Sequence, residues 1–221
     1  FKDIEVIDDC IITKANLNNT KEFKTKQIVY QDYASQRVAV VAGVKKGDKV
    51  LDMCSAPGSK AFHVAALTNN ACSITACDVY EHKTKLIDDM AKMLGVTCIK
   101  TKTCDSSMTK YDEPFDVVLL DAPCSGLGVM KHKVDLKYHF DFNKIKEITT
   151  LQKALLGMAC INTKVGGTLV YSTCTINKQE NEEMIAYFLK KHKNFEVIKE
   201  ESFLPSSKHD GFYICKLKRN S

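Results

Sequence analysis

The sequence of 221 residues is 44% hydrophobic, which is enough for one well-buried domain. It has no uninterrupted apolar run near the roughly 18 residues that a membrane helix needs, and its start at Phe1 has no signal-peptide layout, so we expect a soluble intracellular chain in the cytoplasm, nucleus or nucleolus. The formal net charge of +5 suits a polyanionic partner, although a lysine-rich solvated surface explains it equally well.

The first 30 residues differ from the rest. Residues 1–30 alternate short apolar and polar runs, which predicts short strands or an irregular lead-in without catalytic groups. The first residue is not Met, which is compatible with a remnant of an upstream region. Residues 31–221 follow one continuous pattern, so we expect them to form a single domain.

Within that domain, short apolar runs alternate with helical spacings. We expect a helix from Asp32 or Ser35 to Gly43, and further helices within residues 62–67, 86–94, 145–159 and 184–189. The expected strands are residues 49–53, 73–77, 96–100, 116–120, 168–172, 195–199 and 212–217, and Gly166-Gly167 is expected to turn the chain into the fifth of them. Strands that alternate with helices predict an α/β fold with a mostly parallel seven-stranded sheet and helices on both faces.

The chain has ten cysteines but no Cys-x-x-Cys motif. In a chain of this size without a signal peptide they indicate reduced thiols, and we expect Cys10, Cys98, Cys160 and Cys215 to be buried. Cys72, Cys77 and His82 have no second pair of suitable spacing, so we expect no metal site.

A tight loop with Pro57 and Gly58 joins the first expected strand to a helix. This arrangement brings backbone N–H groups close to a ligand. Asp78 ends the next strand, where a carboxylate reaches ribose hydroxyls in nucleotide-binding folds, so we expect an adenosine-type cofactor. A nicotinamide cofactor is disfavoured because the G-x-G-x-x-G motif is missing. Asp105 follows the third strand and is either an adenine contact or a solvated turn acid.

Two cysteines stand where strands end. Cys124 lies in Asp121-Ala122-Pro123-Cys124-Ser125-Gly126 and Cys174 lies in Ser172-Thr173-Cys174-Thr175. In α/β sheets, ligands bind outside the carboxyl ends of the strands, so the pair suggests thiol chemistry there. Either cysteine alone could equally be an inert thiol, and their spacing leaves open which one attacks a substrate.

These motifs occur in a specific order. Gln31-Asp32-Tyr33-Ala34-Ser35-Gln36 is followed by Asp52-Met53-Cys54-Ser55-Ala56-Pro57-Gly58-Ser59-Lys60, by the two cysteine motifs, by Glu180-Asn181-Glu182 and by His209-Asp210-Gly211-Phe212. In this order, over nearly all of residues 31–221, the chain resembles the Sun/RsmB-like family of RNA cytosine-5 methyltransferases. The resemblance implies a Rossmann-like class I methyltransferase fold, transfer of a methyl group from S-adenosylmethionine, and a cytosine in tRNA or rRNA as the target.

The resemblance also assigns roles to residues. Cys174 would be the nucleophile, Cys124 would release the product, and Asp121 would serve both the base and the cofactor. The implied S-adenosylmethionine-binding residues are Cys54, Ser55, Ala56, Pro57, Gly58, Ser59, Lys60, Asp78, Asp105 and Asp121.

Two departures from the family pattern bear on these roles. Ser59 stands where the family usually has a second Gly, and the stretch after Gly128 lacks the usual Arg and Pro before Asp135. Candidates for RNA contacts beside Cys124, which a solvated loop explains as well, are Lys131, Lys133, Lys137, Tyr138 and His139.

Two other functions compete with this one. A catalytically silent scaffold that binds RNA or assists ribosome assembly is the main alternative, although the intact cysteine pair and cofactor loop argue against it. An N-methyltransferase ranks last, because its usual Asn/Asp-Pro-Pro-aromatic motif is replaced by Asp121-Ala122-Pro123-Cys124. The sequence does not determine the oligomeric state.

Overall fold

The computed structural model describes residues 4–7, 10–13, 15–25, 27–131 and 142–221. The helices are α1 (Lys21–Lys24), α2 (Tyr33–Ala42), α3 (Ser59–Leu67), α4 (Glu81–Met93), α6 (Phe142–Asn162) and α7 (Glu182–Lys191). The strands are β1 (Ile4–Ile7), β2 (Cys10–Thr13), β3 (Lys49–Asp52), β4 (Ser73–Asp78), β5 (Ile99–Thr103), β6 (Phe115–Asp121), β7 (Thr163–Thr173), β8 (Phe195–Phe203) and β9 (Phe212–Arg219).

Seven of the described strands form one sheet in the order β5-β4-β3-β6-β7-β9-β8. The pairs from β5 to β7 are parallel, and β9 lies antiparallel between β7 and β8. The α/β fold and the mostly parallel seven-stranded sheet are therefore confirmed. The strand order reverses at β3, which pairs with both β4 and β6, so ligands are expected in the crevice outside the carboxyl ends of these strands.

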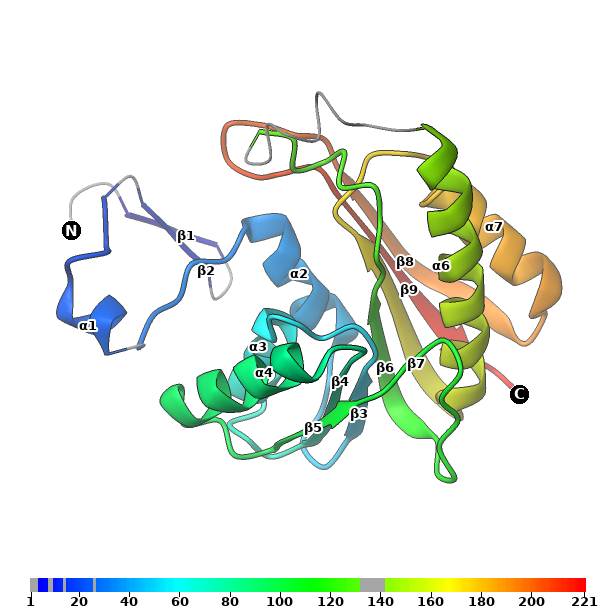
Figure 1. Cartoon of the computed structure of the whole chain (residues 1–221), viewed down its shortest axis with the longest axis horizontal. Coiled ribbons are helices and arrows are strands. Elements are labelled where there is room, and N and C mark those ends of the chain that lie inside the picture. The colour runs from blue at the N-terminus through cyan, green and yellow to red at the C-terminus, as the bar shows by residue number, and fades with distance from the viewer. Residues whose placement is uncertain (1–3, 8–9, 14, 26, 132–141) are drawn as a thin grey trace.

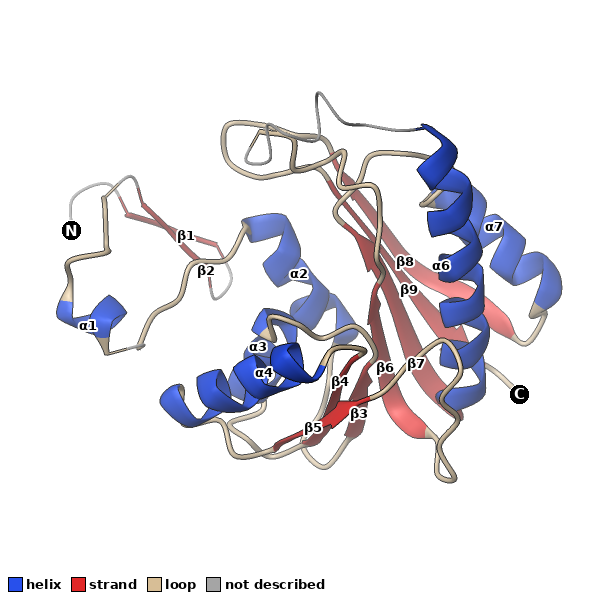
Figure 2. Ribbon diagram, in the orientation of Figure 1, coloured by secondary structure: helices blue, strands red, loops and turns tan. Residues whose placement is uncertain are grey.

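Helices cover both faces of this sheet, as Figure 2 shows. In Figure 1, α2, α3 and α4 lie on one side and α6 and α7 on the other. In β6, Val117 and Leu119 pack with the apolar side chains of α2 and α3, whereas Val118 and Leu120 pack with those of α6 and α7. Because both faces are buried, this strand appears in the sequence as a continuous apolar run.

The start of α2 connects distant parts of the chain. The Asp32 carboxylate accepts hydrogen bonds from the N–H groups of Ala34 (2.9 Å) and Ser35 (3.4 Å), so Asp32, the first of the two predicted starts, is the N-cap. Its other oxygen accepts from the Asp210 N–H at 2.9 Å. The segment before β9 is therefore attached to the N-terminus of α2.

The position predicted for the third strand is wrong by three residues, since β5 begins at Ile99 rather than at residue 96. Gly95 has a φ of 66°, and the N–H of Val96 donates to the carbonyl of Ala91 at 2.8 Å. These are features of a Schellman motif, in which the residue after the glycine still belongs to the helix end. The apolar Val96 therefore closes α4 and packs on its core face.

The turn predicted at Gly166-Gly167 is present, but it lies inside β7 rather than before it. The chain passes from α6 into β7 at Thr163, which pairs with Phe115, and the pairing with β6 resumes at Thr168 opposite Val117. Between these pairs Gly166 takes a φ of 75°, and a Cβ on Gly167 would lie 2.7 Å from the Lys164 carbonyl oxygen. A positive φ at the third residue of a tight turn favours glycine.

The N-terminal residues form the short strands β1 and β2, as predicted, which pair with each other and not with the large sheet. The helix α1 was not predicted. In Figure 1 the β1–β2 pair lies at the left, beyond α2. No helix among the described residues is both long and apolar enough to cross a membrane.

The cysteines largely follow their predicted environments. All ten lie in the described ranges and none forms a disulfide. Cys10, Cys160 and Cys215 are buried, whereas Cys98 is half-buried, beside Cys72. The described residues contain no group of three or more His, Cys, Asp or Glu side chains that could hold a metal ion.

Candidate active site

Three carboxylates lie at the carboxyl ends of neighbouring strands. Asp52 ends β3, Asp78 ends β4 and Asp121 ends β6. The parallel register places Asp52 opposite Ala76 and Leu119, so the three strand ends lie at the same edge of the sheet. Asp78 and Asp121, which the sequence predicts for the cofactor, therefore lie at the point where the strand order reverses, together with Asp52, which was not predicted as a cofactor residue.

The loop after β3 is held by backbone contacts with its neighbours. The N–H of Ser55 donates to the Cys77 carbonyl at 2.8 Å, and the Ser106 hydroxyl donates to the Met53 carbonyl at 2.6 Å. Gly58 precedes α3 with a φ of 99° and has no side chain that could occupy the first N–H groups of the helix. The helix therefore presents its N-terminus to the crevice.

Buried polar atoms in this loop point to a ligand. Asp52 is 1% exposed, and its carboxylate oxygens make no hydrogen bond of ordinary geometry to another described residue, although the Ser55 hydroxyl and the Cys54 N–H face them. The hydroxyl oxygen of Ser55 is likewise buried without a hydrogen bond of ordinary geometry. Burial raises the pKa of Asp52 to about 7, although the Ser55 hydroxyl and the Lys60 ammonium act in the opposite direction. Buried polar atoms without partners are costly, so a bound group that carries positive charge or donor hydrogens fits here.

The charge around Cys54 supports the same conclusion. Burial raises the pKa of its thiol well above the usual range, and the charges of Asp52, Asp121 and Asp78 raise it further. Cys54 therefore stays protonated at neutral pH and is not a nucleophile. The three carboxylates that act on it make the crevice electronegative, which suits a cofactor with a sulfonium and an ammonium group.

Asp78 and Asp105, the two acids predicted to contact the adenosine part of the cofactor, differ in their surroundings. Asp78 is 8% exposed; its Oδ1 accepts from the Tyr80 N–H at 3.1 Å and lies 3.7 Å from the Lys83 ammonium. Asp105 is exposed, two residues beyond the end of β5, and its Oδ1 accepts from the N–H and hydroxyl of Ser107. Asp105 thus closes a local turn, and the alternative of a solvated turn acid remains open for it.

Lys60 connects the cofactor loop to Asp121. Its ammonium lies 2.7 Å from Asp121 Oδ2, and the Ser172 hydroxyl donates to Asp121 Oδ1 at 2.8 Å. Burial lowers the pKa of Lys60, but the charge and hydrogen bond of Asp121 and the charges of Asp52 and Cys174 outweigh it, so that the pKa is raised. Lys60 therefore remains an ammonium although its side chain is only 12% exposed.

The two strand-end cysteines are in contact. Because Asp121 pairs with Ser172 in the parallel ladder, the loops after β6 and β7 begin side by side. The sulfur atoms of Cys124 and Cys174 lie 3.3 Å apart, and both side chains are half-buried. The structure thus brings together the pair that the sequence singles out.

The surroundings of the two sulfurs are not equivalent. A hydrogen bond to Cys174 and burial hold the pKa of the Cys124 thiol well above its usual range, and the charge of Asp121 acts in the same direction. The Lys60 ammonium, in contrast, interacts with the charge of Cys174. The Lys60 ammonium therefore favours a negative charge on Cys174, whereas burial and the charge of Asp121 disfavour one on Cys124.

The sequence alone did not predict some features of the site. The Lys60–Asp121 ion pair joins residues 61 positions apart, and only the register of β3 and β6 brings them together. Of the expected RNA contacts, Lys131 is exposed, whereas Lys133, Lys137, Tyr138 and His139 lie outside the described residues.

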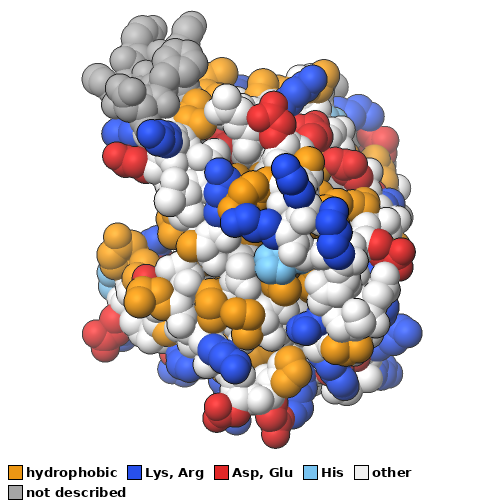
Figure 3. Space-filling view, turned by 90° about the vertical axis from the view of Figure 1, so that its right-hand side faces the viewer, with side chains coloured by type: hydrophobic (Ala, Val, Ile, Leu, Met, Phe, Trp, Pro, Cys, Tyr) orange, Lys and Arg blue, Asp and Glu red, His pale blue; other side chains and the backbone are white. Residues whose placement is uncertain are grey.

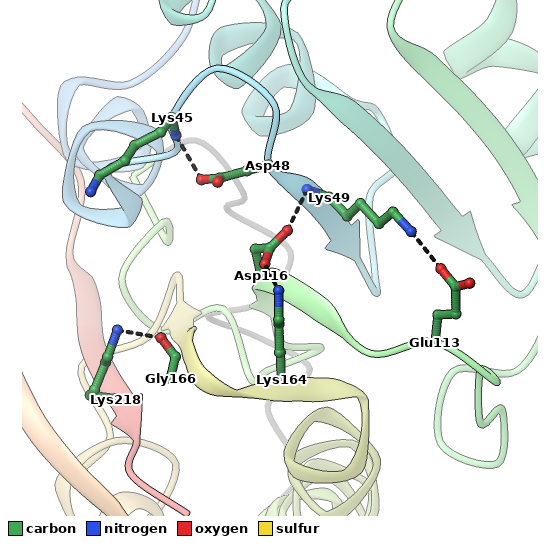
Figure 4. Close-up of polar contacts among 8 residues, drawn as sticks. All are labelled: Lys45, Asp48, Lys49, Glu113, Asp116, Lys164, Gly166 and Lys218. Carbon is green, nitrogen blue, oxygen red and sulfur yellow. Dashed lines mark hydrogen bonds and ion pairs between the residues drawn. The ribbon is translucent and has the colours of Figure 1, made fainter.

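A pocket of about 730 Å³ lies at the opposite edge of the sheet, where β6 and β7 begin. Figure 4 shows contacts among some of its lining residues: Lys164 pairs with Asp116 at 2.9 Å, and Lys218 donates to the Gly166 carbonyl. The carboxylate of Asp48 accepts the backbone N–H of Lys45 at 2.7 Å. These contacts join strand ends and loops, so we assign this edge a structural role.

Comparison with known proteins identifies the family. Residues 39–218 match the family model described as 16S rRNA methyltransferase RsmB/F. A probable ribosomal RNA small subunit methyltransferase B from Bacillus subtilis is 35% identical over 97% of this chain and 53% of its own length. The corresponding protein of Enterobacter sp. is 34% identical over 78% of this chain and 40% of its own length. The chain spans about half the length of these curated relatives.

Two solved structures with a similar fold support the same family. NSun6 from Pyrococcus horikoshii, determined with the S-adenosylmethionine analogue SFG, is 29% identical with a TM-score of 0.86 over 94% of this chain and 57% of its own. A methyltransferase homologue from the same organism has a TM-score of 0.81 and 29% identity over 95% of this chain and 74% of its own. Together with the electronegative crevice, these matches show that the chain belongs to the RsmB/F family of 16S rRNA methyltransferases, with S-adenosylmethionine as its cofactor.

Proposed function

We propose that this chain is the catalytic part of an RNA cytosine-5 methyltransferase that modifies a cytosine in small-subunit ribosomal RNA. The observation that carries the proposal is the contact of 3.3 Å between the sulfurs of Cys124 and Cys174, beside the carboxylates of the cofactor crevice. A pair of thiols is what this reaction requires, because a bond to the base must first form and then break. The names of the relatives favour ribosomal RNA over tRNA.

The first step needs a thiolate. Carbon 5 of cytosine is a poor nucleophile, and a bond from a thiolate to carbon 6 makes it electron-rich. Cys174 supplies this thiolate, since the Lys60 ammonium stabilises its charge. Asp121, held by Lys60 and Ser172, is placed to accept a hydrogen bond from the base at N4 or to stabilise charge near N3.

S-adenosylmethionine supplies the methyl group for carbon 5. Asp52, Asp78 and Lys60 line the crevice proposed to hold it, and Asp52 and Ser55 offer buried polar atoms that make no hydrogen bond of ordinary geometry among the described residues. The target base must be unpaired or flipped out of its stack, because carbon 6 is otherwise out of reach of Cys174.

Release requires Cys124. After methyl transfer, the proton on carbon 5 leaves and the electrons of that bond expel Cys174 as a thiolate. While Cys174 is free, its hydrogen bond holds the pKa of Cys124 high. Once the Cys174 sulfur is bonded to carbon 6, it no longer carries the charge that keeps Cys124 protonated, so Cys124 can lose its proton to water and act as the base.

Lysine and arginine side chains support binding of a polyanion. Figure 3 shows the face on the side of α6 and α7, where these side chains gather at the centre and acidic ones lie mainly toward the margins. The formal net charge of +5 is in line with this distribution. Contacts from such groups to phosphates give affinity that falls as salt is added.

Two substitutions test the proposal. In Cys174→Ala we expect neither methylation nor a covalent complex with RNA, and in Cys124→Ala we expect a covalent complex that persists. Both are measured with small-subunit rRNA transcribed in vitro, radiolabelled S-adenosylmethionine and denaturing gels. A Cys174→Ala protein that still methylates cytosine would refute the assignment of the nucleophile.

A further inference from the structure

Glu180 is a buried acid that the proposed reaction does not use. It lies between β7 and α7 with an exposure of 0%. Its Oε1 accepts from the Ser125 hydroxyl at 2.6 Å and from Asn177 Nδ2 at 3.0 Å, and its Oε2 accepts from the Ser125 N–H at 2.8 Å and from Gln152 Nε2 at 3.3 Å. Burying a carboxylate is costly unless it is hydrogen-bonded, and here four neutral donors converge on it.

These donors belong to the loop of Cys124 and to its surroundings. Ser125 directly follows Cys124, and its hydroxyl also lies 2.8 Å from the Thr175 hydroxyl, next to Cys174. Gln152 on α6 uses the same amide nitrogen to donate to the Pro123 carbonyl at 2.9 Å. The residues on both sides of Cys124 are therefore fixed by Glu180 and Gln152.

The neighbouring residue fixes the other cysteine. Asn181 Oδ1 accepts from the Thr173 hydroxyl at 2.6 Å, and its Nδ2 donates to the Thr175 carbonyl at 3.0 Å. Thr173 and Thr175 are the residues on either side of Cys174. Gln152, Glu180 and Asn181, which we call the clamp, thus hold all four residues that flank the two cysteines.

Backbone hydrogen bonds also fix the two cysteine loops relative to each other, without the side chains of the clamp. The Gly128 N–H donates to the Cys174 carbonyl at 3.0 Å, and the Gly211 N–H donates to the Gly128 carbonyl at 2.9 Å. A Cβ atom on Gly128 would lie 2.0 Å from the Gly211 oxygen, so the two loops and the segment before β9 are as close as backbones allow.

We propose that Glu180 is a positioning residue, which sets the register of the two cysteine loops so that Cys124 lies where the RNA adduct is resolved. This role rests on the proposed function. A carboxylate suits the position because both of its oxygens accept, whereas an amide would turn one of them into a donor that faces other donors. Glu180 contacts the residue after Cys124, whereas Asn181 holds the two residues that flank Cys174, so loss of the Glu180 carboxylate alone slows release more than attack.

The test compares full-length variants on small-subunit rRNA transcribed in vitro. Glu180→Gln leaves one acceptor oxygen, and Glu180→Leu leaves none. We expect release of the covalent complex to slow by at least about tenfold with Leu and by less with Gln, while the rate of complex formation changes little. Cys124→Ala is the reference for a trapped complex. Glu201→Gln is the control, since it disturbs a half-buried carboxylate far from the cysteines, whose partners are Arg37 and Lys199.

A second readout needs no RNA. Oxidation by diamide, which takes two electrons from the two thiols, joins Cys124 and Cys174 at a rate set by their approach, and peptide mass mapping identifies the disulfide. We expect this rate to fall at least about tenfold in Glu180→Gln and to stay unchanged in Glu201→Gln. This readout also decides the matter should Glu180→Leu not fold.

The outcomes distinguish the positioning role of Glu180 from the release step proposed for Cys124. A persistent complex in Cys124→Ala, together with normal release and a normal disulfide rate in Glu180→Gln, would overturn the role of Glu180 alone. A slower disulfide rate in Glu180→Gln without any persistent complex in Cys124→Ala would overturn the release step, and with it the catalytic part of this inference. Equal losses in formation and release, matched by Glu201→Gln, would reduce Glu180 to a stabilising residue.

Discussion

The buried carboxylate of Asp52 makes the stability of the cofactor-free protein depend on pH. Burial raises its pKa from the usual 3.8 to about 7, so between these values the folded protein holds a proton that the unfolded chain has released. The free energy of unfolding therefore falls as pH rises through this window, by about 1.4 kcal/mol per pH unit, and the loss is complete above about pH 7.

Asp52→Asn removes this dependence, because an amide does not ionise. The wild type loses about 3 kcal/mol between pH 5 and pH 8 through this group, so the variant should gain that much relative to the wild type over the same interval. Urea unfolding followed by far-ultraviolet circular dichroism measures the difference, since the chain has no tryptophan. Asp112→Asn, at an exposed position, is the control.

The same substitution should weaken the binding of S-adenosylmethionine at pH 8, because the crevice loses a negative charge that faces a cationic ligand. Isothermal titration calorimetry measures this affinity. If the stability difference between Asp52→Asn and the wild type is the same at pH 5 and pH 8, Asp52 does not carry the raised pKa and the reasoning is wrong.

Three further substitutions test other contacts. Lys60→Met removes the ammonium beside Cys174, so alkylation of that cysteine by iodoacetamide at pH 7 should slow about tenfold; an unchanged rate would show that Lys60 does not stabilise the thiolate. Gly128→Ala forces a Cβ against the Gly211 carbonyl and should cost about 2 kcal/mol or more in urea unfolding, so a fully stable variant would contradict the close packing. Arg37→Met removes one of the two cationic partners of Glu201, the one at 3.0 Å, and leaves Lys199; it should destabilise the protein by about 1 kcal/mol at unchanged affinity for S-adenosylmethionine, and a change in that affinity would mean that the pair acts on the site.

The sequence predicted those parts of the fold that depend on local pattern. Residues 116–120 read as a buried strand because β6 is covered on both faces, and Asp32 was recognisable as a helix cap from its type and place. The turn at Gly166-Gly167 was recognisable from its glycines, but the start of β7 at Thr163 was not. That start depends on the pairing of Thr163 with Phe115, which lies far away in the chain.

The site, like the fold, was predictable where it depends on local pattern. Its acids and cysteines follow strands, so their shared edge could be expected from the parallel sheet. The ion pair of Lys60 with Asp121 and the contact between the two sulfurs depend on register between strands, which local patterns do not encode. Glu180 gave no signal of its own beyond its place in a family motif, because nothing in the sequence indicates that it is buried.

The position of β9 bears on how this protein is made. During synthesis β7 emerges about forty residues before β9, yet β9 is the strand that pairs with its outer edge. Until β9 is made, the outer edge of β7, the strand that leads to Cys174, has no partner strand. Such an open edge can pair with other chains. The contact of Gly211 with Gly128 forms at the same late stage, so synthesis must pass Gly211 before this contact can fix the loop of Cys174.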